Sequence, residues 1–99
     1  MSFRLTELAE ADLECIAAYT AKQWGEAQAL TYTGQLTHAF RKLGGTPSMP
    51  GSRKRDDLAE GCRILAVEKH LIVYRHHAGL TEILRILHQR MDLLLQRLF

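Results

Sequence analysis

The stretch of sequence that decides the fold is EILRILHQRMD, residues 82–92. Residues 83–87 are aliphatic apart from Arg85, a composition that is typical of a strand inside a sheet. The second half of the stretch is polar and ends at Asp92, a residue type that favours a helix N-cap. Apolar residues then recur at helical spacing to the end of the chain: Met91, Leu94, Leu95 and Leu98. The stretch therefore predicts a strand ending at His88, followed by a short C-terminal helix over residues 92–99.

Two more strand-forming runs precede this one. Residues 62–67 and 70–76 are rich in β-branched and aliphatic side chains, and only Glu68 and Lys69 separate them. A turn containing Gly79 then leads into the strand at 81–88. Because such short connections join antiparallel neighbours, the three runs predict a meander. The Gly-, Pro- and Ser-rich residues 44–61 before it predict a surface loop.

The first half of the chain predicts a strand and two helices. Residues 2–6 are extended in character and end at Thr6, a favourable N-cap. A first apolar stripe at helical spacing stops at Gly25, and a second stops at Gly44 and Gly45. The stripes comprise Ala9, Leu13, Ile16, Ala17, Thr20 and Trp24, then Tyr32, Leu36, Ala39, Phe40 and Leu43. We therefore expect a helical hairpin, with Trp24 and most tyrosines in the core.

Together these elements predict the order β-α-α-β-β-β with a short final helix, an α+β fold. Ninety-nine residues fill only one core, so residues 1–99 should form a single domain. The net charge of +2 is weak for a protein that binds nucleic acid directly. Cys15 and Cys62 lie far apart, and neither they nor the histidines have metal-ligand spacing. We therefore expect no metal and no cofactor. We also expect a cytoplasmic protein with no membrane contact, because the acidic N-terminus lacks a leader-like apolar run.

Three arginines interrupt the aliphatic strands. By the two-residue period, Arg63 shares its face with Leu65 and Val67, Arg75 with Leu71 and Val73, and Arg85 with Ile83 and Leu87. An arginine among aliphatic side chains needs a carboxylate, a phosphate or a route to water. Pairing with Glu82, Asp56 or Asp57, snorkelling to the rim and phosphate binding all remain open.

The end of the third meander strand could also carry chemistry. His88 stands beside Arg90, and its imidazole suits general acid-base work on RNA. The alternative is a histidine that anchors the final turn through hydrogen bonds. The basic triplet at residues 53–55 lies in the loop, where such charges are usually solvated.

Three blocks of the sequence together resemble the ParE-type toxins of the RelE/ParE superfamily. The first runs from a Pro-Gly pair at 50–51 to an L-x-x-G-x-R pattern at 58–63, and the second is the apolar run 71–75, which ends in Tyr-Arg. The third and most specific is R-I-L-H-x-R-M-D at residues 85–92. The resemblance implies a small antiparallel sheet with the helical hairpin packed on one face, which agrees with the order read from the residues.

The resemblance also implies the toxin component of a type II toxin-antitoxin system, neutralised by a ParD-like antitoxin. Such an antitoxin folds onto the toxin as it binds, and operator DNA is then reached only through the antitoxin. The toxin should present apolar surface along its hairpin and C-terminal stripe. The residues expected to bind the antitoxin are Leu13, Tyr32, Leu36, Phe40, Met91, Leu94, Leu95 and Leu98.

Within the superfamily, ParE-like members poison DNA gyrase and RelE-like members cut messenger RNA in the ribosome. Arg63, Arg85 and His88 match the nucleases in part, whereas Gln89 and Arg90 stand where those enzymes often have a tyrosine. We therefore expect a non-enzymatic gyrase poison whose target-binding residues are Arg63, Arg85, His88 and Arg90. The alternatives are a ribosome-dependent endoribonuclease with Arg63, Arg85 and His88 as catalytic residues, and a non-toxic co-repressor that only binds its antitoxin.

Overall fold

The computed structural model describes residues 2–99, in the order strand, two helices, four strands and a short turn. The elements are β1 (Ser2–Leu5), α1 (Glu7–Trp24), α2 (Glu26–Gly45), β2 (Arg53–Lys54), β3 (Cys62–Val67), β4 (His70–His77), β5 (Leu80–His88) and the 3-10 turn η1 (Leu93–Leu95). The α+β class and the expected order are therefore confirmed. Two details differ: the loop contains the short strand β2, and the C-terminal helix is a single 3-10 turn.

The strands form a mixed sheet in the order β1-β5-β4-β3-β2. The meander β3-β4-β5 is antiparallel as expected, but β1 runs parallel to β5. The sheet is therefore not purely antiparallel. The parallel pair arises because β1 enters beside a strand that lies almost eighty residues later, so no short turn fixes its direction.

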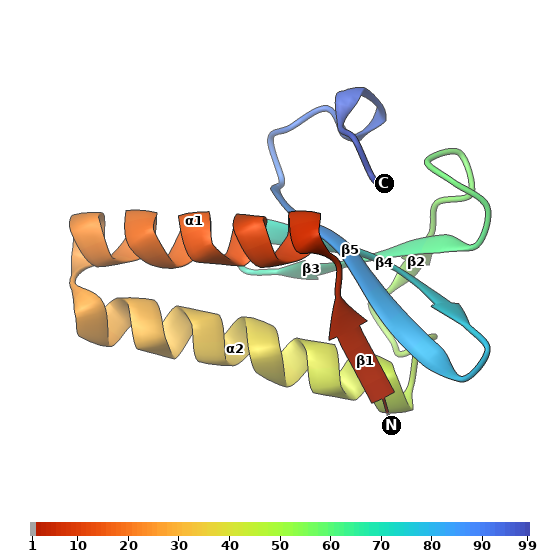
Figure 1. The fold of residues 1–99 in the computed structure, drawn as a ribbon, viewed down its shortest axis with the longest axis horizontal. Helices are drawn as coiled ribbons and strands as arrows, with labels where there is room; N and C mark the ends of the chain where they lie inside the picture. The colour runs from red at the N-terminus through yellow and green to blue at the C-terminus, as the bar shows by residue number, and fades with distance from the viewer. Residues whose placement is uncertain (1) are drawn as a thin grey trace.

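Local sequence explains the helical hairpin. The hydroxyl of Thr6 accepts a hydrogen bond from the backbone N–H of Ala9 (3.2 Å), which caps α1. Gly25 separates the two helices with φ of 95°, a conformation that L side chains rarely adopt. The helices then pack antiparallel, and their connecting turn projects beyond the sheet (Figure 1).

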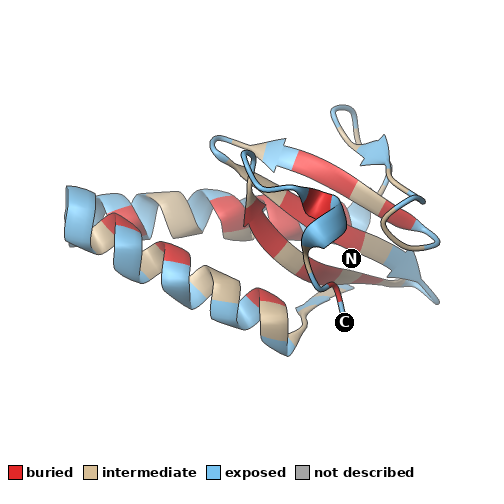
Figure 2. Ribbon diagram, turned by 90° about the horizontal axis from the view of Figure 1, so that it is seen from above, coloured by how far each residue is buried: buried red, intermediate tan, exposed pale blue. Residues whose placement is uncertain are grey.

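The sheet carries an apolar cluster on each face. On the helix face, the two helical stripes pack on residues of β3, β4 and β5, and the largest fully buried side chains there include Tyr74 and Phe40. On the second face, Leu93 and Leu98 pack against aliphatic residues of the three meander strands. Figure 2 looks onto the sheet with the C-terminal turn lying across it. The end of the chain thus covers apolar surface that the helices leave open.

A β-bulge changes the face on which Arg85 lies. The register between β4 and β5 shifts at Val73/Tyr74, so Val73 pairs with Arg85 while Tyr74 pairs with Ile83. Ile83 therefore belongs to the helix-face cluster, and Val73 to the second-face cluster. The expectation that Arg85 shares a face with Ile83 is wrong, because a bulge adds one residue and reverses the alternation. The expected faces of Arg63 and Arg75 agree with the register.

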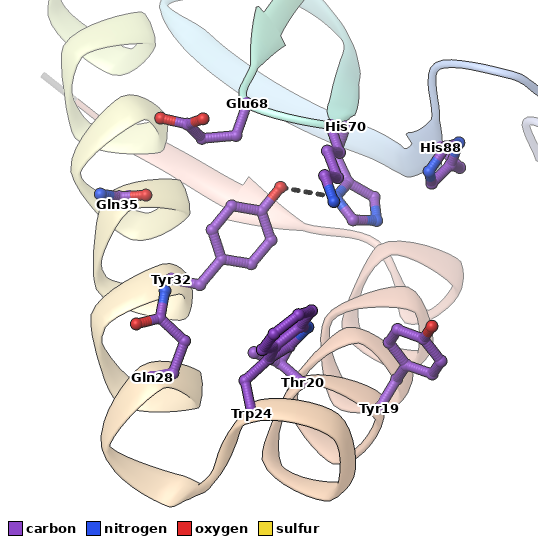
Figure 3. Close-up of a pocket in the computed structure, with 10 residues that line it drawn as sticks. Tyr19, Thr20, Trp24, Gln28, Tyr32, Gln35, Glu68, His70 and His88 are labelled. Carbon is purple, nitrogen blue, oxygen red and sulfur yellow. Dashed lines mark hydrogen bonds between the residues drawn. The ribbon is translucent and has the colours of Figure 1, made fainter.

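The core assignment of Trp24 is also wrong. Its side chain is 70% exposed, and Tyr19 one turn earlier is 65% exposed. Trp24 is the last residue of α1, at the end of the hairpin that projects beyond the sheet (Figure 1), and Figure 3 shows Tyr19 on the same helix. In residues 2–99, neither helix is long and apolar enough to cross a membrane.

Candidate functional site

The edge of β5 is where the candidate site begins. Strand β1 covers this edge only as far as Leu5, which pairs with Ile83. Beyond that point two side chains replace the missing strand: the Thr6 hydroxyl donates to the carbonyl of Leu84 (2.9 Å), and the carboxylate of Asp12 accepts the backbone N–H of Ile86 (2.9 Å). Helix α1 thereby satisfies backbone groups that an open edge would leave exposed.

Asp12 also holds the guanidinium of Arg85. The Nε and one terminal nitrogen of Arg85 donate to the two carboxylate oxygens at 2.7 and 2.9 Å, a bidentate pair. Both side chains are about 15% exposed, at 15% for Arg85 and 16% for Asp12. The hydrogen bond to Asp12 raises the pKa of Arg85, so the guanidinium keeps its charge. We call this pair the Asp12–Arg85 clamp.

The clamp reaches the end of the chain. The other terminal nitrogen of Arg85 donates to the backbone carbonyl of Arg97 at 2.6 Å. One guanidinium therefore joins α1, β5 and residues 91–99, which we call the C-terminal segment. Arg85 matches the arginine of the sequence motif, but in this structure its donors serve the protein's own groups.

The C-terminal segment rests on the second face of the sheet. Asp92 caps η1 by accepting the N–H of Leu94 (3.0 Å), as the sequence predicted. Leu93 and Leu98 are buried, and the guanidinium of Arg75 lies 4.7 Å from the centre of the Phe99 ring. Leucines 94 and 95 point away from the sheet and are 65% and 79% exposed. The segment thus presents apolar side chains to solvent from an anchored backbone.

Glu82 fixes the arginine beneath Phe99. Its carboxylate accepts from Arg75 Nε (2.9 Å) and also pairs with Arg4 on β1. The hydrogen bond from Arg75, with a smaller contribution from Arg4, holds the pKa of Glu82 below its ordinary value. Of the alternatives left open for the strand arginines, pairing with Glu82 is the one that the structure shows for Arg75.

A cleft of about 670 Å³ opens between the helical hairpin and the turn from β3 to β4. Its lining residues, shown in Figure 3, are Tyr19, Thr20, Trp24, Gln28, Tyr32, Gln35, Glu68, Lys69, His70 and His88. Inside this hairpin cleft, a 2.6 Å hydrogen bond joins the Tyr32 hydroxyl to Nδ1 of His70. Burial lowers the pKa of His70, and the neighbouring His88 lowers it further. Burial likewise raises the pKa of Tyr32, so both groups favour their neutral forms.

His88 and Arg90 lie together beside the hairpin cleft, which His88 also lines. The ring of His88 makes an edge contact with that of His70, with centroids 5.5 Å apart. Nδ1 of His88 accepts the backbone N–H of Arg90 (3.1 Å), which helps to form the turn after β5. A smaller pocket beside it is lined by Glu68, Lys69, His88, Gln89 and Arg90. This end of the sheet is therefore basic and accessible.

Arg63 lies elsewhere. It pairs with Tyr74 near the start of β3, whereas His88 aligns with His70 at the far end of the sheet. One terminal nitrogen of Arg63 donates to the Ser52 hydroxyl (2.8 Å), and its buried Nε has no hydrogen-bond partner. Arg63 faces the helices while Arg85 faces the opposite side. The structure therefore brings His88 and Arg90 together. Arg63 lies apart from both of them, and it also lies apart from Arg85.

The residues expected to bind an antitoxin fall into three groups by exposure. Met91, Leu94 and Leu95 are exposed. Leu13 and Tyr32 are partly buried and pack against the helix-face core. Leu36, Phe40 and Leu98 are buried, with at most 8% exposure, so they support the fold and offer no free surface. The helical stripe read as a binding surface is thus largely the packing face of α2.

The importance of Asp12 was missed by sequence reasoning, although a pattern pointed to it. Asp12 lies three residues after Ala9 and four before Ile16, so it falls on the buried stripe of α1. A carboxylate on an apolar stripe requires a partner. Its partner was indicated by Arg85, the arginine that interrupts the aliphatic strand β5. Among residues 2–99, no three His, Cys, Asp or Glu side chains converge as a metal site.

Comparisons with known proteins place these features in a family. The family model described as "ParE toxin of type II toxin-antitoxin system, parDE" matches residues 3–93. A curated relative named Toxin ParE1 from Mycobacterium tuberculosis is 35% identical over 91 residues, with 91% of each chain covered. Toxin ParE1 from Caulobacter vibrioides is 33% identical over 90 residues, again with 91% of each chain covered. Toxin ParE from Escherichia coli is 33% identical over 97 residues, covering 94% of this chain and 89% of the relative.

A solved structure shares the fold. The chain superposes on one from the chromosomal ParDE toxin-antitoxin system of P. aeruginosa with a TM-score of 0.75 and 24% identity. The match covers 89% of this chain and 95% of the other. Both α-helices and the sheet therefore belong to a known architecture.

Proposed function

Because the chain belongs to the ParE toxin family of type II toxin-antitoxin systems, we propose that it arrests growth by poisoning DNA gyrase and that a ParD-like antitoxin neutralises it. The observation that carries this proposal is the family match, which extends from β1 to η1. Curated relatives from three genera are matched over about nine-tenths of this chain. No separate catalytic domain is then needed, since the toxin acts by binding.

The positions of the motif residues favour a binding function over RNA cleavage. A nuclease needs its acid, base and phosphate-binding groups within hydrogen-bond reach of one reacting phosphate. Arg63 and Arg85 lie on opposite faces of the sheet, and Arg85 is held in the Asp12–Arg85 clamp. Only His88 and Arg90 remain together and accessible.

Two surfaces are available for the gyrase interaction. One is the basic end of the sheet around His88 and Arg90, and the other is the exposed apolar part of the C-terminal segment. Interfaces often combine an apolar centre with a charged rim. We therefore place the gyrase contact on these neighbouring parts of the molecule, without Arg63.

The antitoxin contact is proposed for the hairpin side. Tyr19, Trp24 and Leu30 are large apolar residues with 65% to 75% exposure on the two helices. Exposed side chains of this size are a common mark of a protein interface. A segment that folds as it binds could cover them together with the hairpin cleft.

The test is a supercoiling assay with purified chain and gyrase. We expect inhibition of supercoiling and accumulation of gyrase-cleaved DNA, both relieved by the antitoxin encoded beside the gene. A translating extract assayed in parallel should keep its messenger RNA intact. Unchanged supercoiling at a large excess of folded chain would refute the proposal, and transcript cleavage in the extract would establish the nuclease alternative. Growth that continues after induction of the gene without its neighbour would support the co-repressor alternative.

A further inference from the structure

The C-terminal segment has little structure of its own. After the three-residue turn η1, the last four residues have no helix or strand, so their positions depend on contacts with the rest of the chain. Leu93 and Leu98 anchor the two ends in the second-face cluster. Apolar contacts of this kind hold a segment close to a surface, but they are non-directional and leave its backbone free to shift.

At its start, the segment is tied to β5 by the N–H of Met91, which donates to the carbonyl of His88 at 3.0 Å. Near its end, the directional contact is the bond from Arg85 to the carbonyl of Arg97. Arg97 lies between the two apolar anchors, directly before Leu98. The guanidinium that makes this bond is in turn oriented by the bidentate contact with Asp12, because a planar fork held at one edge has its other nitrogen fixed. Asp12 is itself fixed by the backbone N–H of Ile86. A continuous chain of hydrogen bonds therefore runs from α1 to the C-terminal segment.

This arrangement determines which side chains the segment presents. With its backbone anchored, Leu94 and Leu95 point outward while Leu93 points in. Arg90 and Arg97, both exposed, lie in the chain on either side of these leucines. An apolar centre with cations on either side suits a protein surface that carries nearby anionic groups, as an enzyme bound to DNA does.

We propose that Arg85 and Asp12 are positioning residues: the clamp orients the C-terminal segment so that Leu94 and Leu95 contact the target, and Arg85 itself does not touch it. This inference rests on the proposed function, with DNA gyrase as the partner. It changes the role of Arg85 from a target-binding residue to an internal support. It also predicts that an aspartate on α1, on the far side of β5 from the segment, controls toxicity.

The main test compares Arg85→Lys with Arg55→Lys. Lysine keeps the positive charge but cannot hold both carboxylate oxygens and the distant carbonyl with one point charge. Arg55 makes an equally bidentate pair with Asp57, at 2.9 Å for both bonds, on the loop between β2 and β3. The full-length variants are compared for gyrase inhibition, for growth arrest and for the rate at which trypsin cuts after Arg97.

We expect Arg85→Lys to speed cleavage after Arg97 and to raise the concentration for half-maximal inhibition, each by about tenfold, while Arg55→Lys changes neither. Faster cleavage after Arg97 is a readout that a direct target contact would not move. If Arg85→Lys loses inhibition while its segment stays as protected as in the unchanged protein, Arg85 contacts the target directly and the proposal is wrong.

A second variant keeps the test decisive if Arg85→Lys fails to fold. Leu95 is 79% exposed, so Leu95→Ser should leave both folding and trypsin resistance unchanged. We expect it to weaken inhibition by about tenfold or more, as loss of an interface anchor does. Full activity of Leu95→Ser and of Leu94→Ser would overturn the proposal.

The same variants separate this inference from the proposed function. If the unchanged protein arrests growth without affecting gyrase, the proposed target is wrong. The clamp inference is then tested by the growth arrest that the variants cause. If gyrase is inhibited but neither Arg85→Lys nor Leu95→Ser weakens inhibition, the target stands and the clamp inference fails.

Discussion

Replacing Asp12 by alanine should destabilise the protein more than any other single change at an ionisable residue of α1. The substitution removes three hydrogen bonds at once: two from Arg85, at 2.7 and 2.9 Å, and one from the backbone N–H of Ile86, at 2.9 Å. It leaves a poorly hydrated guanidinium without its counter-charge. It also uncovers the edge of β5 where β1 has ended.

The expected loss follows from the burial of the pair. Removing one partner of a fully buried ion pair costs about 3–5 kcal/mol, and an unpaired backbone N–H adds about 1 kcal/mol. Because both side chains keep about 15% exposure, water offsets part of this, and we expect a net loss of about 3 kcal/mol. A domain of this size has about 5–10 kcal/mol of stability in total, so the variant should still fold.

Urea unfolding followed by circular dichroism measures this loss. At a slope of about 1.5 kcal/mol per molar urea, the midpoint should fall by about 2 M with an unchanged slope. The midpoint of Asp12→Asn should lie between those of the unchanged protein and Asp12→Ala, since an amide oxygen can still accept the N–H of Ile86. Asp57→Ala is the matched control, because it breaks a bidentate pair that is exposed to solvent, and its midpoint should stay near that of the unchanged protein. Equal midpoints for Asp12→Ala and Asp57→Ala would refute the reasoning.

Three further predictions concern acid stability and packing. Because Arg75 lowers the pKa of Glu82, this pair stabilises the fold above the ordinary carboxylate pKa and loses that contribution as the pH falls through the folded value; Glu82→Gln should flatten the acid side of a stability–pH curve, and an unchanged curve would contradict this. Burial lowers the pKa of His70, so the contribution of the neutral imidazole to the free energy of unfolding is complete above about pH 6.5 and declines as the pH falls towards the folded value. The stability–pH curve of His70→Asn should lack this decline, and a decline that persists in the variant would show that another group causes it. Leu36→Ala should cost about 3 kcal/mol in urea unfolding because Leu36 is fully buried, whereas Leu30→Ala, at 75% exposure, should cost under about 0.5 kcal/mol, and similar losses would show that the core is placed wrongly.

Most of the architecture was readable from local patterns. The alternation and short turns of residues 62–88 predicted the meander, and the stripes broken at Gly25 predicted the hairpin. These patterns succeed because each depends on residues within a few positions of one another. The cap residues Thr6 and Asp92 were readable for the same reason.

The errors arose where distant residues meet. The pairing of β1 with β5 joins positions almost eighty residues apart, and only packing of the hairpin decides its parallel direction. The exposure of Trp24 depends on how far the hairpin extends beyond the sheet, which its own periodicity does not encode. The face of Arg85 depends on a bulge opposite Val73 and Tyr74, which leaves no mark in the two-residue period.

The candidate site divides in the same way. The sequence by itself determined the family, the strand that carries Arg85, and the amphipathic end of the chain, because these are properties of contiguous residues. Only the tertiary structure decided that Arg85 pairs with Asp12, that Arg63 faces the other way, and that the last residues lie on the second face of the sheet. An ion pair between residues 12 and 85 forms when packing brings α1 against β5, so neither local sequence contains the information that fixes it.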